Sequence, residues 1–178
     1  MMADEQVVPR PLLRSERPGD EAAIAAVIEA AFGQRDEAEL VARLRAAAAL
    51  PVSLLAELDD HVLGHVALSP VAVDGADGQG RCWLGLAPLA VRPEHQRRGI
   101  GTALVTAALD AARARGAAAV FVLGRPSYYG RRGFEETAPH GWSCTYPAPP
   151  AAFRVHTLDR HLLPPPGTVH YHPAFDAL

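Results

Sequence analysis

Residues 89–104 read LAVRPEHQRRGIGTAL. The apolar run that ends at Val91 predicts a strand, and the periodic apolar pattern that follows predicts a helix over residues 102–115. Gly99 and Gly101 lie between the two, where glycine lets the backbone turn its N–H groups toward one point at the positive end of the helix dipole. This arrangement predicts an anion cradle suited to a pyrophosphate.

The local charge agrees with an anion site. Residues 92–101 contain Arg92, Arg97 and Arg98 against the single acid Glu94, inside a chain whose net charge is −3. A chain without an overall positive field is a poor match for a nucleic-acid partner, which proteins bind largely by neutralising phosphates. We therefore expect phosphate binding to be confined to this loop.

Several other chemistries are excluded by composition and spacing. All 17 basic residues are arginines, so a Walker-type phosphate loop and a pyridoxal phosphate Schiff base both lack their lysine. Cys82 and Cys144 form no C-x-x-C pair, which excludes a zinc ribbon or a redox dithiol of that kind. A dinucleotide-binding turn fits poorly, because Leu104 stands where its third glycine would be.

Upstream of the cradle the pattern predicts helices and then an antiparallel meander. Asp36 is expected to cap the second helix while Glu39 reaches back to it. Pro88 has no N–H to donate and predicts a break in the last strand. The predicted strands are 12–15, 52–57, 62–73 and 82–91, and the two helices begin near residues 20 and 36.

Downstream of the cradle we expect a buried strand over 118–123 and a proline-rich tail with short strands over 142–146, 153–158 and 169–171. A chain of 178 residues with 49% hydrophobic composition suits one domain over 1–178. We expect residues 1–10 to be flexible and 139–178 to belong to the same domain. The sequence shows no secretory signal or membrane span, and we expect a cytoplasmic protein that contacts no membrane.

At residues 89–104 the sequence resembles the acetyl-CoA signature of GNAT acetyltransferases. A second element, YGRRGF from Tyr129 to Phe134, is similar to the family's Tyr-x-x-x-Gly-Phe motif, and LGRPSY precedes it. The order of predicted helices and strands is also the family's order. The whole chain is similar to a group of small bacterial N-acetyltransferases, with the tail the less specific part.

The resemblance implies an α+β (mixed α/β) fold with a twisted mixed sheet flanked by helices. It also implies that the central parallel strands 84–91 and 118–123 splay apart and admit the pantetheine arm of acetyl-CoA. Pro88 supplies a physical cause, because an unpaired strand edge can be satisfied by the two amides of the arm. The residues expected to contact acetyl-CoA are Leu89, Ala90, Val91, Gln96, Arg97, Arg98, Gly99, Ile100, Gly101 and Thr102.

The implied reaction is direct attack of a neutral primary amine on the thioester carbonyl. The backbone N–H of Leu89 or Ala90 is the candidate donor to the oxyanion. Tyr129 is the candidate catalytic acid that protonates the leaving thiolate, because a phenol is protonated at neutral pH. A purely structural Tyr129 packed on Phe134 is the alternative, and Tyr128 is the spare candidate.

The general base is the point where the sequence departs from the family. Strand 84–91, where many relatives place a glutamate, has no carboxylate or histidine. Water, a substrate group, or Glu37 or Glu39 are the alternatives. Arg125 stands where related sequences tend to carry an acid, so their acceptor does not transfer to this chain.

Two further readings compete with an acyltransferase that uses acetyl-CoA and an amine acceptor. One is a non-catalytic acyl-CoA-binding module. The other is a metal site in the tail, where His170 and His172 share one face of a strand and His156 and His161 precede them. We expect no metal, and the family suggests a homodimer.

Overall fold

The computed structural model describes residues 10–76 and 81–178. Of the stretch 1–10 that we expect to be flexible, all but Arg10 lies outside the described residues. Nine strands of the described chain form one mixed sheet in the order β1-β2-β3-β4-β5-β8-β6, with β9 pairing β3 and β7. They are β1 (Leu12–Ser15), β2 (Val52–Leu58), β3 (His61–Val73), β4 (Cys82–Val91), β5 (Ala117–Leu123), β6 (Glu135–Glu136), β7 (Trp142–Cys144), β8 (Phe153–Thr157) and β9 (Gly167–Tyr171).

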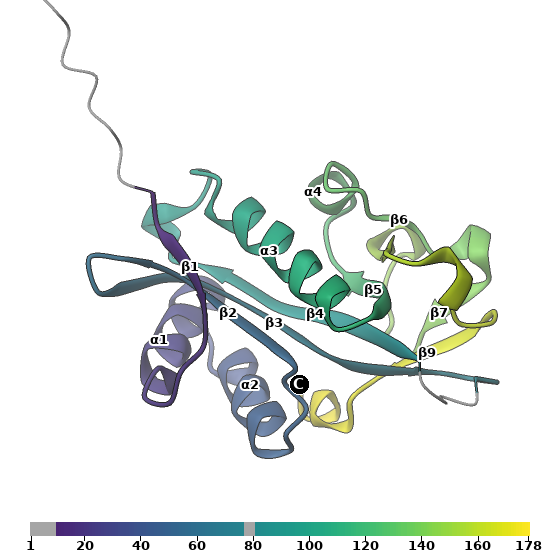
Figure 1. Cartoon of the computed structure of the whole chain (residues 1–178). Helices are drawn as coiled ribbons and strands as arrows, with labels where there is room; N and C mark the ends of the chain where they lie inside the picture. Colours follow the sequence, from purple (N-terminus) through teal and green to yellow (C-terminus); the bar gives the residue numbers. More distant parts are fainter. Residues whose placement is uncertain (1–9, 77–80) are drawn as a thin grey trace, which may run out of the picture.

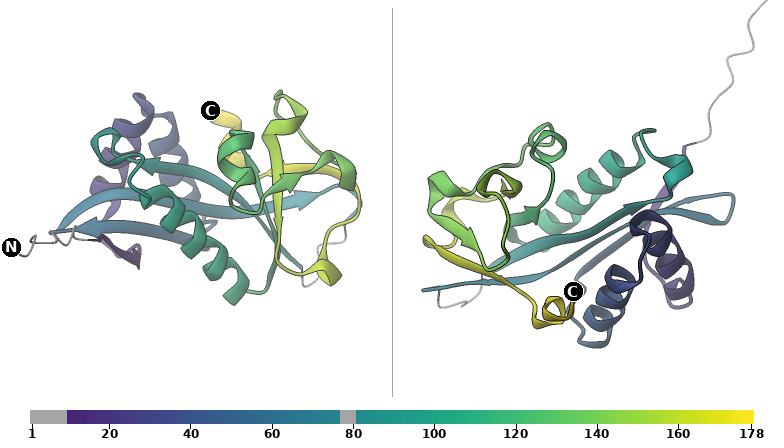
Figure 2. Two further views of the ribbon diagram at one scale, coloured as in Figure 1. Left: turned by 90° about the horizontal axis from the view of Figure 1, so that it is seen from above. Right: turned by 180° about the vertical axis from the view of Figure 1, so that it is seen from behind.

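Helices cover both faces of the twisted sheet (Figure 1). α1 (Glu21–Phe32) and α2 (Asp36–Ala46) lie on one face and α3 (Ile100–Ala114) lies on the other, as the right view of Figure 2 also shows. A single-turn helix, α4 (Pro126–Gly130), follows β5. The 3₁₀ segments are η1 (Pro93–His95), η2 (Ala138–His140), η3 (Pro150–Ala152), η4 (Arg160–Leu162) and η5 (Pro173–Ala177).

The helices pack through apolar residues at three- and four-residue spacing, which is the pattern of an amphipathic helix. α3 buries Leu104, Val105, Ala108, Leu109 and Ala112 against the sheet. Removing this apolar surface from water is the main source of its stability. None of the described helices combines the length and the apolar character needed to cross a membrane.

The starts of two helices differ from the predictions. α3 begins at Ile100 rather than at Thr102, because Gly99 caps it in the left-handed conformation with φ of 85°. At α2 the predicted capping box is wrong: Arg35 is the N-cap residue and no side chain caps the helix. Asp36 is already inside the first turn there, and Glu39 instead forms an ion pair with Arg43 at 3.7 Å.

The central parallel strands part as predicted. β4 and β5 pair from Cys82 with Ala117 to Gly85 with Phe121, and within the described residues no pairing continues beyond that point. β4 then remains bonded only to β3 on its other edge, up to Val91, while β5 continues along β8. Pro88 lies in the stretch that has parted, which agrees with its missing N–H. The predicted mixed fold with splayed central strands is confirmed.

The proline-rich tail adds strands on both sides of the parting. β8 pairs antiparallel with β5, β9 pairs antiparallel with the end of β3, and β7 pairs parallel with β9. Two tryptophans fasten the loops between them: Trp83 Nε1 donates to the carbonyl of Leu162 at 2.9 Å, and Trp142 Nε1 donates to that of Pro165 at 3.0 Å. The tail thereby faces the open end of the β4–β5 pair.

Candidate functional site

A cavity of about 410 Å³ lies where β4 ends, α3 begins and α4 approaches; we call it the cradle cavity. It brings together most of the residues that the sequence singles out. Those in its lining are Leu89, Val91, Gln96, Arg97, Gly99, Gly101, Thr102 and Tyr129. Arg125, Arg132 and Tyr128, the spare candidate for the catalytic acid, complete the lining.

The loop into α3 is shaped to receive an anion. Arg97 and Gly99 both have positive φ, 59° and 85°, which curls the chain just before the helix. The side-chain amide of Gln96 donates to the carbonyl of Val91 at 3.0 Å and ties the loop to the end of β4. The first N–H groups of a helix have no intrahelical acceptor, so those of α3 are available to a ligand.

The two glycines leave room for a ligand to approach the backbone. A Cβ atom on Gly99 would meet nothing within 4 Å, whereas a Cβ on Gly101 would lie 2.8 Å from the hydroxyl oxygen of Tyr128. The space beside Gly101 is therefore the narrow part of the cradle cavity. A side chain at this position would fill it.

Three predicted residues do not bring their side chains to the cradle cavity. Ala90 is 1% exposed and packs with α1 on the opposite face of the sheet, because successive strand residues alternate between faces. Ile100 is 6% exposed and packs under α3. Arg98 is exposed and lies outside the lining. Only backbone groups of Ala90 and Ile100 are available for the roles predicted for them.

The positive charge of the site comes only in part from the loop that the sequence indicated, through Arg97. The Nε of Arg92 donates to the carbonyl of Val62 at 2.9 Å, so its side chain lies along β3 and away from the cradle cavity. Arg125 and Arg132 replace it. A neighbouring cavity of about 500 Å³ is lined by both of these and by Arg131. Among the described residues no carboxylate lines either cavity.

Arg132 is held in place by its contacts. Its guanidinium carbon lies 3.5 Å from the centroid of the Tyr128 ring, and its NH1 group donates to the Tyr128 carbonyl. Its NH2 group donates to the hydroxyl of Thr102 in α3. The four-residue spacing of Tyr128 and Arg132 is the signal that could have found this pair, since residues at i and i+4 meet on a helical turn.

Tyr129 both packs against Phe134, as expected of a structural residue, and lines the cradle cavity, as expected of a catalytic acid. Its ring lies 5.3 Å from that of Phe134 at 72°, and it also lines the cradle cavity. Burial raises the pKa of Tyr129 well above its usual range; the nearby Tyr128 raises it further and Arg132 opposes the rise. The phenol therefore keeps its proton at neutral pH. Burial also raises the pKa of Tyr128.

The candidate bases on α2 lie away from this site. Both oxygens of the Glu37 carboxylate accept from the Gln34 amide, at 3.0 and 3.1 Å, and Glu39 pairs with Arg43. Neither glutamate lines the cradle cavity, because α2 covers the opposite face of the sheet from α3. Glu37 and Glu39 are therefore not placed beside Tyr129 as bases.

The histidines of the tail have partners of other kinds. His170 Nε2 lies 2.8 Å from a carboxylate oxygen of Asp74, and His172 Nδ1 accepts from the N–H of Ala174 at 3.1 Å. The ring of His156 lies 5.2 Å from that of Phe134. In the part of the chain that the structure describes, no group of three or more His, Cys, Asp or Glu side chains is arranged to hold a metal ion.

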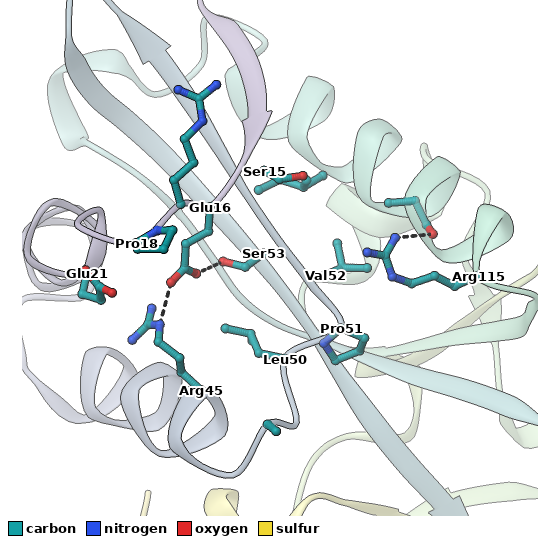
Figure 3. Close-up of a pocket in the computed structure, with 14 residues that line it drawn as sticks. Ser15, Glu16, Pro18, Glu21, Arg45, Leu50, Pro51, Val52, Ser53 and Arg115 are labelled. Atoms are coloured by element: carbon teal, nitrogen blue, oxygen red, sulfur yellow. Dashed lines mark hydrogen bonds and ion pairs between the residues drawn. The ribbon is translucent and has the colours of Figure 1, made fainter.

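A polar cavity of about 460 Å³ lies beside the end of β1, and Figure 3 shows an ion pair within it. Arg45 Nε donates to Glu16 at 2.6 Å, and the hydroxyl of Ser53 donates to the same carboxylate. Behind Ser53, at 2.9 Å, lies the buried imidazole of His65, whose pKa burial lowers to about 3 with a further contribution from Arg45. Arg115 lines this cavity from the carboxyl end of α3, a full helix length from the cradle.

The family model described as the acetyltransferase (GNAT) family matches residues 21–134. The chain belongs to this family. As a GNAT protein it is 41% identical over 167 residues to the uncharacterised N-acetyltransferase YhbS of Escherichia coli, covering 93% of this chain and 98% of YhbS.

Solved structures of GNAT proteins share the whole architecture. The crystal structure of E. coli YhbS in complex with CoA matches with a TM-score of 0.86 at 40% identity, covering 94% of this chain and 92% of that one. A GNAT acetyltransferase from Brucella melitensis in complex with acetyl-CoA matches with a TM-score of 0.77 at 39% identity, covering 93% and 97%. The family resemblance predicted from residues 89–104 is confirmed.

Proposed function

We propose that this GNAT protein transfers the acetyl group of acetyl-CoA to a primary amine. The observation that carries the proposal is the coincidence of two features at one place: the cradle cavity at the start of α3 and the parting of β4 from β5. A coenzyme with a pyrophosphate at one end and an amide-bearing arm at the other needs both. The complexes of YhbS with CoA and of the Brucella protein with acetyl-CoA support this choice of donor.

The residues present fit acetyl-CoA. The free N–H groups of Gly99, Gly101 and Thr102 suit a pyrophosphate, and the open space before Gly99 lets its oxygens reach the backbone. Arg132 has a buried Nε with no hydrogen-bond partner in the described chain, a donor that a phosphate can satisfy. Arg97 and Arg125 add charge to the same lining.

The edge of β4 beyond Gly85 would receive the pantetheine arm. Its backbone groups no longer pair with β5, and unpaired backbone donors and acceptors that leave water need new partners. Leu89 and Val91 lie on this edge and also line the cradle cavity. We propose that the whole described chain works as one domain, because β8 and β9 of the tail pair with β5 and β3 on either side of the opening.

In the proposed reaction the amine nitrogen forms a bond to the acetyl carbon and the bond from that carbon to sulfur breaks. The thiolate takes the proton of the Tyr129 hydroxyl, and the proton released by the amine nitrogen restores Tyr129. The high pKa of Tyr129 keeps the phenol protonated and ready to donate. The backbone N–H of Leu89 or Ala90 would donate to the developing oxyanion.

The proposal is tested first by binding and then by turnover. Acetyl-CoA at 100 times its dissociation constant should stabilise the folded protein by about 2.7 kcal/mol, which raises the thermal midpoint. Release of CoA thiol is then followed over a panel of amines that differ in size, charge and polarity. Stabilisation with release supports an acetyltransferase. Stabilisation without release over the whole panel favours the non-catalytic acyl-CoA-binding module.

A further inference from the structure

A second cavity opens at the same parting of β4 and β5, from the opposite face of the sheet. Its volume is about 370 Å³, within the usual range of small-molecule sites, and we call it the apolar cavity. Leu86 and Ala87 of β4 and Leu123 of β5 line it, together with Tyr146, Tyr171 and Phe175 of the tail.

The two cavities approach the opening from different sides. Tyr128 and Tyr129 of the cradle cavity pack in the core cluster that contains α3. Tyr171 and Phe175 of the apolar cavity pack in the cluster that contains Leu40 of α2, whereas Leu86 packs in the α3 cluster. The two cavities share no lining residue. A donor that enters from the α3 side therefore leaves the apolar cavity free for the acceptor.

The lining of the apolar cavity determines the chemistry of an occupant. Among the described residues, no Asp, Glu, Arg or His lines it. An ammonium ion that left water for such a site would pay a desolvation penalty with no charged side chain in the lining as its partner, so burial favours the neutral amine. The cavity thus favours the neutral amine, which is the form that attacks the thioester. No side chain of β4 can act as a base to produce this form.

Tyr171 belongs to the wall of the cavity at this point. Its ring packs against Gly85, the last β4 residue paired with β5, so closely that a Cβ on that glycine would lie 2.5 Å from a ring carbon. Its side chain is nine-tenths buried, and its hydroxyl oxygen is buried without a hydrogen-bond partner in the described chain. Tyr171 therefore adds its ring to the apolar wall of the cavity.

We propose that the apolar cavity is the acceptor site and that its substrate is a small hydrophobic primary amine, bound uncharged. This inference rests on the proposed function and names its acceptor class. The lone pair of the amine stays free to attack, while the apolar substituent lies against Leu86, Leu123 and Phe175.

One acidic side chain near the apolar cavity favours a cationic acceptor instead. Asp176 of η5 is exposed, and after burial it is the next cause of the raised pKa of Tyr146. A cationic acceptor such as a polyamine would use this carboxylate rather than the apolar wall. The experiment therefore compares 2-phenylethylamine with spermidine and with ethanolamine.

The variant Leu123→Glu places a charge at the apolar cavity on a residue that is 37% exposed, so the fold tolerates it. Leu162→Glu is the matched control, because Leu162 is 40% exposed and lies outside the cavity lining. Two quantities are measured for parent and variants: amine binding to the CoA complex by calorimetry, and kcat/KM for acetylation. Acetyl-CoA stabilisation is recorded for each variant as the check on the donor site.

We expect kcat/KM for 2-phenylethylamine to exceed that for the two polar amines by at least about tenfold, the usual scale for filling an apolar pocket. Leu123→Glu should lower both binding and kcat/KM for 2-phenylethylamine by about tenfold or more, and Leu162→Glu should lower neither.

Other results separate the two proposals. The hydrophobic acceptor is overturned if the protein acetylates spermidine or ethanolamine as efficiently as 2-phenylethylamine. It is also overturned if Asp176→Asn loses activity and Leu123→Glu does not. In both cases the proposal of an acetyltransferase is unaffected. Binding of 2-phenylethylamine that depends on Leu123, without release of CoA from any amine, supports the site and overturns the acetyltransferase. Absence of 2-phenylethylamine binding overturns the site directly.

Discussion

The guanidinium carbon of Arg132 lies 3.5 Å from the centre of the Tyr128 ring, and the same guanidinium donates to the hydroxyl of Thr102. One arginine thereby connects α4 to the first turn of α3. A cation stacked on an aromatic face contributes roughly 0.5–2 kcal/mol, depending on how far it is removed from water. The side of the cradle cavity that we propose to face the phosphates is thus held together within the protein itself.

Arg132→Gln should weaken acetyl-CoA binding, because it removes the charge, the stacking and the donor with the buried unpaired Nε. Loss of a hydrogen bond to a charged group costs about 1.5–3 kcal/mol, so the dissociation constant should rise about tenfold or more. Arg98→Gln is the control, since Arg98 is exposed and lies outside the lining. Equal effects of the two changes on calorimetric binding would contradict the assignment of Arg132.

Gly101→Val should abolish stabilisation by acetyl-CoA. A Cβ at this position would lie 2.8 Å from the Tyr128 hydroxyl oxygen, so the side chain takes the space of the ligand. The helix itself should persist, because valine has a higher helix propensity than glycine. Thermal unfolding with and without acetyl-CoA checks this, with Thr106→Val one turn further along α3 as the control. If acetyl-CoA raised the thermal midpoint of Gly101→Val as much as that of the parent, the cradle cavity would not be the acetyl-CoA site.

Tyr129→Phe should separate binding from catalysis, because it keeps the ring beside Phe134 and removes the proton. We expect acetyl-CoA to bind nearly as well as in the parent and turnover to fall about 10²- to 10⁴-fold, the range for losing a general acid. Tyr128→Phe is the control. Should Tyr128→Phe lose turnover and Tyr129→Phe keep it, Tyr128 is the acid.

The pH dependence of turnover follows from the same residue. Tyr129 acts as a phenol, and burial raises its pKa above the ordinary value of 10.0, with Tyr128 raising it further and Arg132 opposing the rise. A raised pKa moves loss of the acid to higher pH. We therefore expect kcat to show no alkaline decline between pH 7 and about pH 10, the ordinary phenol pKa. A decline centred near pH 8 would mean that a different acid is used.

A pH effect on stability is expected at the start of the chain. Arg14 donates to Asp20 at 2.7 Å and lowers the pKa of Asp20 to about 2 from 3.8. A carboxylate with a lowered pKa stabilises the fold above its unfolded pKa and loses this contribution as the pH falls toward the folded value. The stability difference between the parent and Asp20→Asn, from urea midpoints, should be constant above pH 5 and shrink below about pH 4. A difference that persists unchanged to pH 3 would contradict it.

Local signals explain what the sequence could predict. β4, α3 and the glycines between them follow from apolar periodicity and backbone freedom, which neighbouring residues determine. Arg92 was misplaced because its partner, the carbonyl of Val62, lies on another strand. Arg125 was not assigned to the site because α4, which follows it, is a single turn, too short to produce a periodic pattern. The apolar cavity was not foreseen because its walls come from β4, β5 and a tail segment whose meeting depends on strand pairing.

The complete separation of the two linings has a consequence for how such a protein can change. Substitutions in the tail, at positions such as Tyr146 or Phe175, alter the wall of the apolar cavity without touching the loop that leads into α3. If the two cavities hold the acceptor and the donor as proposed, selection can change the acceptor while the donor site is inherited intact. Paralogues built on this plan should diverge fastest after β5 and remain most alike across residues 89–104.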